Sequence, residues 1–581
     1  MKQGAIPNRV APLFVSLDAS VQYTKGKTMS RAIDPKYLQF GSLSSTVINS
    51  KYAKFPTQQD QQTWPEISSR VSESVFKVVP AKRDLIDEVA YRIAIRQIIP
   101  GGRYLYAAGR DYHQVQNCLL MRAEDSREGW SEIMHNASMA LMSGAGIGVE
   151  YSHVREKGAL IRKTGGEATG PTALMQMVNE AGRFIQQGGS RRSAIWAGLG
   201  WDHKDIFDFI HLKDWSPEVK ALKAKDFNFP ATMDGTNVSV RLDGEFFKAY
   251  NDTSHPKHLH AVRVYWETVQ QMLMTGEPGF SIDTGENEGE TLRNACTEIT
   301  SATDSDICNL LSINLARINT LEDMQVCVEI GTALLVAGTE YSHVPYSKVA
   351  EIRSLNRRLG LGLMGIHEWL IQHGKKYGPD DDLAKYLEIY AQSTEVAHGW
   401  EGKWNLSPSL KTRAIAPTGT IGIVAETSTG AEPIFCVAFK RRYLNGKTWN
   451  YQYVVETIAK RLIEEDGISP ESIEDAYSIE PERRVKFQVW LQQYVDHGIS
   501  STINLPAWGS EANNEDKVED FGNMLLKYLP KLRGITCYPD GARSGQPLTA
   551  VSYKQAMKHK GQIFVESQDV CDITRGGTCG S

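Results

Sequence analysis

The sequence predicts an α/β fold built around a largely parallel β-sheet. From about residue 110 to 540, short apolar runs alternate with amphipathic helical segments and glycine-rich turns. This order is typical of a sheet whose strands are joined by helices. The chain has 581 residues, which is enough for one large α/β barrel or for two or three ordinary domains.

The composition argues against several classes of protein. Hydrophobic residues make up 41% of the chain and charged residues 23%, as in soluble globular proteins. The most apolar stretch, near 328–337, contains Glu329 and Gly331 and is too short to cross a bilayer. A net charge of −5 gives no reason to expect a nucleic-acid surface, and no secretory signal is visible. We therefore expect a cytoplasmic protein that binds neither membrane nor nucleic acid.

The cysteines are too sparse for a disulfide scaffold and show no CxxC pair of the kind that binds zinc, so no metal site is expected. In a reducing compartment, any disulfide is expected to be catalytic or transient. The eight cysteines are Cys118, Cys296, Cys308, Cys327, Cys436, Cys537, Cys571 and Cys579.

The segments before and between the apolar runs can be assigned in order. Residues 1 to about 60 are rich in Ser, Thr, Gln and Lys, which predicts an irregular, partly disordered arm. Residues 65–98 carry apolar residues at three- and four-residue spacing, which predicts helices. Further helices are predicted over 171–187, 262–275, 321–338, 383–399, 451–465 and 515–529.

The last 40 residues change in character. After a short helix-like stretch, the chain ends in "VESQDVCDITRGGTCGS", which finishes in Gly and Ser and contains Cys571 and Cys579. A flexible segment with two thiols has the composition that a mobile redox arm needs. A frayed terminus with incidental cysteines is the alternative interpretation.

The stretch "RNACTEITSATDSDICNL" is the most informative about chemistry. Cys296 has an amide two residues before it, Asn294, and a carboxylate two residues after it, Glu298. In an extended loop these three side chains point the same way and converge on one ligand. The thiol can exchange a hydrogen atom, Glu298 can act as a general base, and Cys308 can supply electrons through a disulfide. Two buried structural cysteines are the alternative.

Four other segments carry candidate binding residues. The loop in 414–435 combines small and hydroxyl residues that can cradle a phosphate, although an ordinary turn explains it too. The GxGxG turn in 141–150 fits ligand contact or close backbone packing. Segment 186–198 sets two arginines in a Gly/Ser loop, which can bind phosphates or form a solvated face. Segment 116–130 places Cys118 in an apolar strand.

Together these segments resemble the ribonucleotide reductase catalytic subunit, in the family's order, over roughly 100–540 and the tail. The resemblance implies a ten-stranded α/β barrel of two five-stranded parallel half-sheets, antiparallel to each other, around a central finger loop. It also implies the domain limits: an irregular arm over 1–60, a helical region over 61–110, the barrel over 111–545 and a redox tail over 546–581.

The resemblance also implies a role for each candidate residue. Cys296 would become a thiyl radical that takes the 3′ hydrogen of the ribose, Glu298 would accept the 3′-hydroxyl proton, and Asn294 would orient the ribose hydroxyls. Cys118 and Cys308 would deliver two electrons and end as a disulfide. Cys571 and Cys579 would re-reduce that pair, although their C-x7-C spacing is wider than expected for such a tail. The substrate would be held by Asn117, Gly146, Pro417, Thr418, Gly419 and Thr420, the last four at its phosphates.

The source of the radical divides the family. "NRRLGLGLMGIHEWL" and "RGITCYPDGAR" resemble the adenosylcobalamin-dependent class. A two-subunit enzyme, in which a ferritin-like small subunit makes the radical, would have adjacent tyrosines where this chain has Cys537 and Tyr538. Thr297 is more reminiscent of that second class, since adenosylcobalamin enzymes usually have glycine there. We expect adenosylcobalamin as the cofactor, with the two-subunit type as the alternative.

The resemblance extends to regulation and partners. Five residues match positions that bind a dNTP or ATP specificity effector in dimeric members: Asp125, Ser126, Arg155, Arg191 and Arg192. Because that site lies at a two-fold interface, a homodimer is implied. A thioredoxin- or glutaredoxin-like protein would serve as the external reductant, and both ribonucleoside di- and triphosphates are open as substrates.

Overall fold

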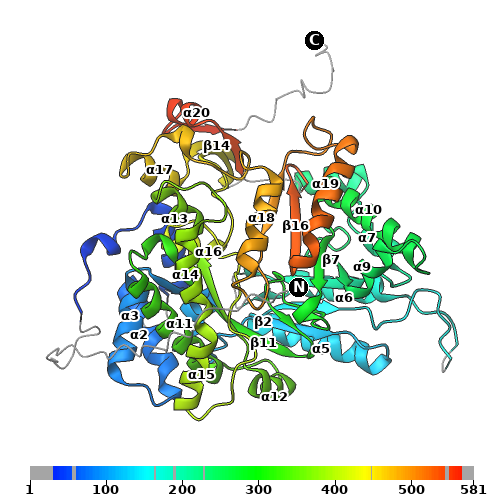
Figure 1. Cartoon of the computed structure of the whole chain (residues 1–581), viewed down its shortest axis with the longest axis horizontal. Coiled ribbons are helices and arrows are strands. Elements are labelled where there is room, and N and C mark those ends of the chain that lie inside the picture. The colour runs from blue at the N-terminus through cyan, green and yellow to red at the C-terminus, as the bar shows by residue number, and fades with distance from the viewer. Residues whose placement is uncertain are drawn as a thin grey trace, which may run out of the picture.

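The computed structural model describes residues 31–54, 61–162, 165–187, 191–226, 229–445, 448–542 and 548–565. An α/β fold with a large sheet confirms the predicted fold class. The predicted N-terminal helices are also present, as α2 (Trp64–Val75) and α3 (Arg83–Ala94). They pack against the long helix α11 (Leu321–Tyr341) (Figure 1). None of the helices within the described residues is long and apolar enough to cross a membrane.

Two sets of parallel strands form the large sheet. The first half-sheet contains, in spatial order, β2 (Cys118–Arg122), β3 (Gly146–Glu150), β6 (Ile195–Gly200), β7 (Thr236–Asp243) and β8 (Gly279–Asp283). The second contains β11 (Asp306–Asn314), β12 (Leu359–Met364), an extended segment at 413–415, β15 (Thr502–Leu505) and β16 (Gly534–Pro539). β6, β8 and β12 are buried along their whole length, and most residues of the other strands are buried too, because helices cover the outside and side chains fill the inside.

The two half-sheets close into a ring. β11 runs antiparallel to β2 at one seam, and β16 runs antiparallel to β8 at the other. Within the second half, single bridges Leu361–Arg413 and Ile415–Ile499 carry the hydrogen bonding across 413–415. Ten strands therefore surround one interior, as the resemblance to the reductase family implied. A short extra strand, β1 (Ile98–Pro100), pairs antiparallel with β11 outside this ring.

Helices cover the outside of the ring (Figure 1). Four of the predicted helices are present within a few residues, as α6 (Pro171–Phe184), α10 (His258–Thr275), α11 and α19 (Glu515–Tyr528). The prediction of one helix over 383–399 was wrong. This region forms α14 (Asp381–Ala391) and α15 (Ser393–Lys403), which are separated at Gln392.

A small antiparallel sheet at the top of Figure 1 was not predicted. β14 (Thr448–Val455) pairs with β13 (Ala438–Asn445), so the helix expected over 451–465 is confined to α17 (Thr457–Glu464). The β-branched and aromatic residues at 451–455 favour the strand once a partner is available. Two segments of the expected tail also belong to this sheet, β17 (Leu548–Val551) and β18 (Ile563–Val565). Cys571 and Cys579 lie outside the described residues.

The N-terminal arm is more regular than predicted. Residues 1–30 and 55–60 lie outside the described part, but α1 (Ser42–Val47) and a π-helical turn (Ile48–Tyr52) are well formed. The hydroxyl of Ser44 donates to the carbonyl of Val424, which joins α1 to α16 (Gly419–Ala425). The low periodicity of this segment concealed helices that are stabilised by tertiary contact.

Candidate active site

The segment between β8 and β11 forms a narrow hairpin inside the ring. β9 (Leu292–Arg293) pairs antiparallel with β10 (Thr300–Ser301), and Cys296 lies at the tip between them. β9 contacts β2, β3 and β6 of the first half-sheet, while Gly498 of the second half lies against the backbone of Thr297 and Glu298. The tip therefore projects between the two half-sheets.

Close approach of this hairpin explains the GxGxG turn. A Cβ atom at Gly148 would overlap the carbonyl oxygen of Arg293, so only glycine allows β9 to lie against β3. A Cβ atom at Gly146 would stand 3.2 Å from the Cβ of Ala295. Backbone packing therefore accounts for Gly148 without any ligand.

The tip is a turn, not the extended loop that the sequence predicted. Thr297 has a left-handed backbone with φ of 67°, and its N–H donates to the carbonyl of Asn294 at 3.1 Å. The side-chain oxygen of Asn294 accepts from the N–H of Ile299 at 3.0 Å. The amide of Asn294 thus closes the turn that presents Cys296, in addition to any contact with a ligand.

Glu298 has the properties of a general base. Its side chain is 1% exposed, and its Oε2 atom has no hydrogen-bond partner among the described residues. Burial raises the pKa of Glu298 to about 7, although hydrogen bonds from Asn294 and Cys118 partly oppose this shift. A carboxylate with a pKa near 7 and a free acceptor atom is suited to accept a proton from a bound hydroxyl.

Cys118 and Cys308 lie directly opposite each other across the β2–β11 seam. Opposed residues in an antiparallel pair have Cα atoms about 4.5 or 5.5 Å apart, which is within the range that a disulfide spans. The Cys118 thiol donates to Glu298 at 3.9 Å. Burial raises the pKa of both thiols well above the ordinary value, so both are protonated at neutral pH. The pair can release two electrons with two protons.

A cavity of about 270 Å³ borders Cys296. Strands from both half-sheets contribute to its wall, which includes Asn237, Ser239, Glu277, Ser501, Thr536 and Tyr538. Cys118 and Cys308 are not part of this wall, although Cys118 is close enough to Cys296 for the two to interact electrostatically. Cys296 therefore has the cavity on one side and the thiol pair on the other.

The sequence did not single out the polar residues of this wall. Asn237 and Ser239 alternate with apolar residues in β7, a two-residue period that was the available signal. On β16, Cys537 is buried in a hydrophobic cluster with Ile535, whereas Thr536 and Tyr538 are partly accessible. Burial raises the pKa of Cys537 to about 12, so its thiol is protonated at neutral pH.

The predicted phosphate loop reaches the same cavity. Pro417 is part of the wall, and Thr418, with a left-handed φ of 54°, precedes helix α16. The N–H of Gly430 donates to the Thr418 hydroxyl at 2.8 Å, which braces the loop. Gly419 and Thr420 follow in the first turn of α16. Asn117 directly precedes β2, and its backbone bonds to Cys308 and Gly146.

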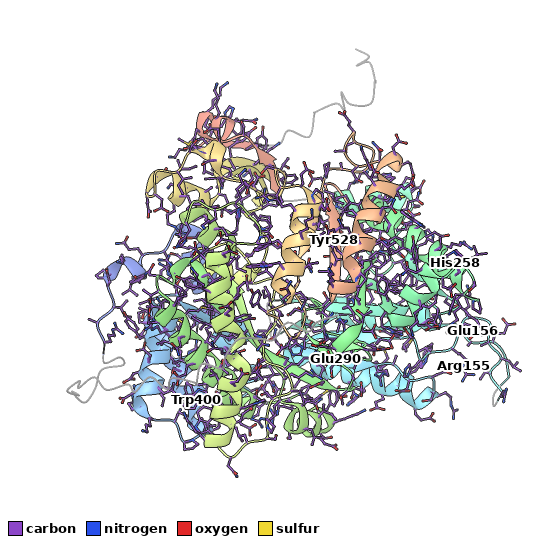
Figure 2. All side chains as sticks on the ribbon, in the orientation of Figure 1. Arg155, Glu156, His258, Glu290, Trp400 and Tyr528 are labelled. Carbon is purple, nitrogen blue, oxygen red and sulfur yellow. The ribbon has the colours of Figure 1, made fainter. Side chains whose placement is uncertain are left out.

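The predicted effector residues are grouped outside the ring. Arg155 Nε donates to both carboxylate oxygens of Asp125 at 3.0 and 2.8 Å, and Ser126 caps α5 (Arg127–Ser143). Arg155 lies toward the periphery in Figure 2. Arg191 and Arg192 form the short strand β5, paired with β4 (Gln186–Gln187). The side chains of these two arginines lie outside the described part.

Comparison with known proteins agrees with this geometry. The family model "Ribonucleotide reductase, barrel domain" matches residues 116–256, 245–395 and 410–538. A vitamin B12-dependent ribonucleoside-diphosphate reductase of Thermoplasma acidophilum is 28% identical over 516 residues, which cover 78% of this chain and 65% of that protein. A protein with the same name from Mycobacterium tuberculosis H37Rv is 24% identical, over 79% of this chain and 71% of its own length.

A third relative matches over more of both chains. It comes from Mycobacterium phage D29, and its name places it with the adenosylcobalamin-dependent ribonucleoside-triphosphate reductases. It is 23% identical, over 87% of this chain and 89% of its own length. The family model covers more than half of the chain and includes the ring, the hairpin and the thiol pair. The chain therefore belongs to the ribonucleotide reductase barrel domain family.

Proposed function

We propose that this protein reduces ribonucleotides to 2′-deoxyribonucleotides with adenosylcobalamin as its radical-generating cofactor. The observation that carries the proposal is the position of Cys296. It lies at the tip of the hairpin, between a cavity with a partly polar wall and the Cys118–Cys308 pair. Beside that pair lies a Glu298 oxygen that has no hydrogen-bond partner among the described residues. The names of the three relatives support both the reaction and the cofactor.

The residues of the chain account for each bond that changes. Cys296, as a thiyl radical, takes the 3′ hydrogen of the ribose, and Glu298 accepts the 3′-hydroxyl proton. The 2′-hydroxyl then leaves as water. Cys118 and Cys308 give up two hydrogens and form a disulfide, and Cys296 returns the 3′ hydrogen. The overall change is ribonucleotide plus two thiols to deoxyribonucleotide, disulfide and water. The buried interior keeps bulk water from the radical.

Adenosylcobalamin would supply the radical by homolysis of its cobalt–carbon bond. The cavity beside Cys296 suits a nucleoside group, because its wall offers hydroxyl and amide partners at Ser239, Asn237, Ser501 and Thr536. The two-subunit alternative is less well supported. Cys537 stands at the first tyrosine position and packs in a hydrophobic cluster, so the adjacent pair of tyrosines that this type needs is reduced to Tyr538.

The proposed reductase activity also implies three binding partners: a second copy of this chain, an effector nucleotide and a reductant protein. Helices α5 and α6 pack side by side and expose the apolar side chains of Met139, Met142, Met177 and Phe184, the last 81% exposed. An exposed apolar patch of this kind favours a protein interface, and we assign it to a homodimer. A dNTP or ATP effector would bind near Asp125, Ser126 and Arg155. A thioredoxin-like reductant would act through Cys571 and Cys579.

The proposal is tested by turnover of the purified chain. Cytidine and adenosine di- and triphosphates are incubated with dithiothreitol and an effector nucleotide, with and without adenosylcobalamin. Deoxynucleotide formed only with the cofactor is the expected result. Turnover that requires an added ferritin-like subunit would replace the cofactor assignment, and no product under either condition would contradict the proposed reaction.

In a chain that carries Cys571→Ser and Cys579→Ser, so that the tail cannot re-reduce the pair, turnover without an external reductant is expected to leave one new disulfide, between Cys118 and Cys308. The two are opposed across the seam, whereas Cys327 is buried in a separate hydrophobic cluster and Cys436 is buried elsewhere in the chain. Peptide mapping after differential alkylation measures the pairing, with Cys327 as the internal control. Product formed while Cys118 and Cys308 both remain alkylatable would contradict the assignment.

A further inference from the structure

Four charged groups lie at the base of the hairpin, two of them buried (Asp306 and Arg358) and two largely buried (Glu290 and Lys411). Glu290 precedes β9, and Asp306 begins β11, so they flank the hairpin in sequence. Their partners lie in the second half-sheet: Arg358 directly precedes β12, and Lys411 lies two residues before Arg413. Lys411 Nζ contacts Glu290 at 2.5 Å, and Arg358 contacts Glu290 at 3.3 Å and Asp306 at 2.6 Å. Figure 2 shows Glu290 near the centre of the molecule.

This ion network contacts the hairpin strand that follows Glu298. The Thr300 hydroxyl donates to Glu290 at 2.6 Å, and the Ser301 hydroxyl donates to Asp306 at 2.7 Å. Residues 497 and 498, next to the network, also bind the hairpin through hydrogen bonds to its backbone. The N–H of Thr300 donates to Nδ1 of His497 at 3.2 Å, and the N–H of Gly498 donates to the carbonyl of Glu298 at 2.7 Å.

The charges in the network balance. Burial raises the pKa of Glu290, but Lys411 and Arg358 outweigh burial and hold that pKa below its ordinary value. Burial, together with Arg358 and Lys411, holds the pKa of His497 well below its ordinary value. His497 therefore stays neutral and accepts the Thr300 hydrogen bond at Nδ1. Two carboxylates and two cations remain, joined to a neutral imidazole.

A network of this kind resists displacement. Removing one member leaves a buried charge without its partner, so the remaining groups must move or admit water. Hydrogen transfer is sensitive to such movement, since a misplacement of about 1 Å can slow a reaction by about 10²-fold. Thr300 is only two residues from Glu298 and four from Cys296. A shift of β10 therefore moves both reacting groups relative to Cys118 and Cys308.

We propose that Glu290, Arg358, Lys411, Asp306 and His497 are positioning residues that hold the Cys296–Glu298 tip in register with the Cys118–Cys308 pair. None of them is part of the cavity wall. They set the rate of hydrogen transfer and leave nucleotide affinity unchanged. The kinetic part of this inference rests on the proposed reductase activity. The structural part, that the network orders the hairpin, does not.

The test compares two matched arginine variants of the full chain. Arg358→Met removes the cation shared by Glu290 and Asp306. Arg92→Met removes a similar cation, shared by Glu88 and Asp323 at 2.6 Å each in the N-terminal helical region. Arg358→Met is expected to lower kcat by about 10²-fold, with KM and nucleotide affinity by calorimetry within about threefold. Arg92→Met is expected to leave kcat and KM near those of the unmodified protein.

Amide hydrogen exchange gives a readout that needs no turnover. In Arg358→Met, exchange in a peptide covering 292–301 is expected to accelerate, while exchange in β3 and β6 stays unchanged. The Arg92→Met variant should show ordinary exchange at 292–301. If the unmodified protein had no reductase activity, this measurement would still decide whether the network orders the hairpin.

Thr300→Val provides a milder variant should Arg358→Met fail to fold, because it removes one hydrogen bond and leaves every charge in place. It is expected to lower kcat without a matching rise in KM and to accelerate exchange at 292–301. A double variant, Glu290→Gln with Lys411→Met, is expected to recover part of the activity lost in Lys411→Met, since no unpaired charge remains. Unchanged kcat and exchange in Arg358→Met and Thr300→Val, or equal losses of kcat and nucleotide affinity, would overturn the proposal.

Discussion

Cys296→Ser is expected to lose turnover by about 10³-fold or more, equivalent to about 4 kcal/mol in the barrier, while nucleotide affinity is retained. A serine O–H bond is stronger than a thiol S–H bond, so the hydroxyl cannot exchange a hydrogen atom with the cofactor or the ribose. Because serine and cysteine side chains are similar in size, we expect the substitution to preserve both the turn that Asn294 closes and the wall of the cavity.

The measurement is deoxynucleotide formation together with nucleotide binding by calorimetry. Cys327→Ser is the matched control, since Cys327 is fully buried in α11 and lies in a different hydrophobic cluster from Cys118 and Cys308. This variant is expected to keep kcat and lose only stability. Substantial turnover by Cys296→Ser would place the radical on another residue. If nucleotide binding were lost together with turnover, the role of Cys296 would be to maintain the shape of the cavity and not to carry the radical.

Glu298→Gln is expected to lower kcat by about 10²- to 10⁴-fold, the usual contribution of a general base, and to remove a pH dependence. Burial raises the pKa of Glu298 to about 7. Below pH 7 the carboxyl is therefore protonated and cannot accept the 3′-hydroxyl proton; above pH 7 it is ionised and can. In the unmodified protein, kcat/KM should rise with pH through about 7 and then level off.

Glu456 supplies a matched control, because burial also raises its pKa to about 7, yet it caps α17 in the small sheet region. Glu456→Gln should keep the rise in kcat/KM near pH 7. Glu298→Gln should keep only a low kcat/KM that does not rise near pH 7. A pH profile that is unchanged in Glu298→Gln would assign the titration to another group and remove Glu298 from the role of base.

Features that depend on neighbouring residues could be predicted from the sequence. The spacing of apolar residues located α6, α10, α11 and α19, since amphipathic periodicity reports which face is buried. The candidate residues Asn294, Cys296 and Glu298 lie within five positions, so one segment carried them together. The alternation of apolar runs and helices predicted the α/β class, while the ring itself came from resemblance to a known family.

The errors arose where tertiary contacts outweigh local preference. Residues 451–455 have the composition of a strand at one end of an amphipathic segment, and pairing with β13 determined the outcome. α1 has little periodicity of its own and is held by α16. The extended loop expected at Cys296 is instead a turn with a left-handed Thr297, because the hairpin must reverse within the narrow interior of the ring.

The sequence by itself therefore determined the class of fold and the chemical groups available for the reaction. Only the tertiary structure decided which groups meet. Cys118 and Cys308 face each other because two half-sheets join at an antiparallel seam. Glu290 and Lys411 pair across the interior although 121 positions separate them. Burial, which raises the pKa of Glu298, also results from the closed ring. Such contacts depend on how distant strands close around one interior, and local sequence patterns carry no record of that closure.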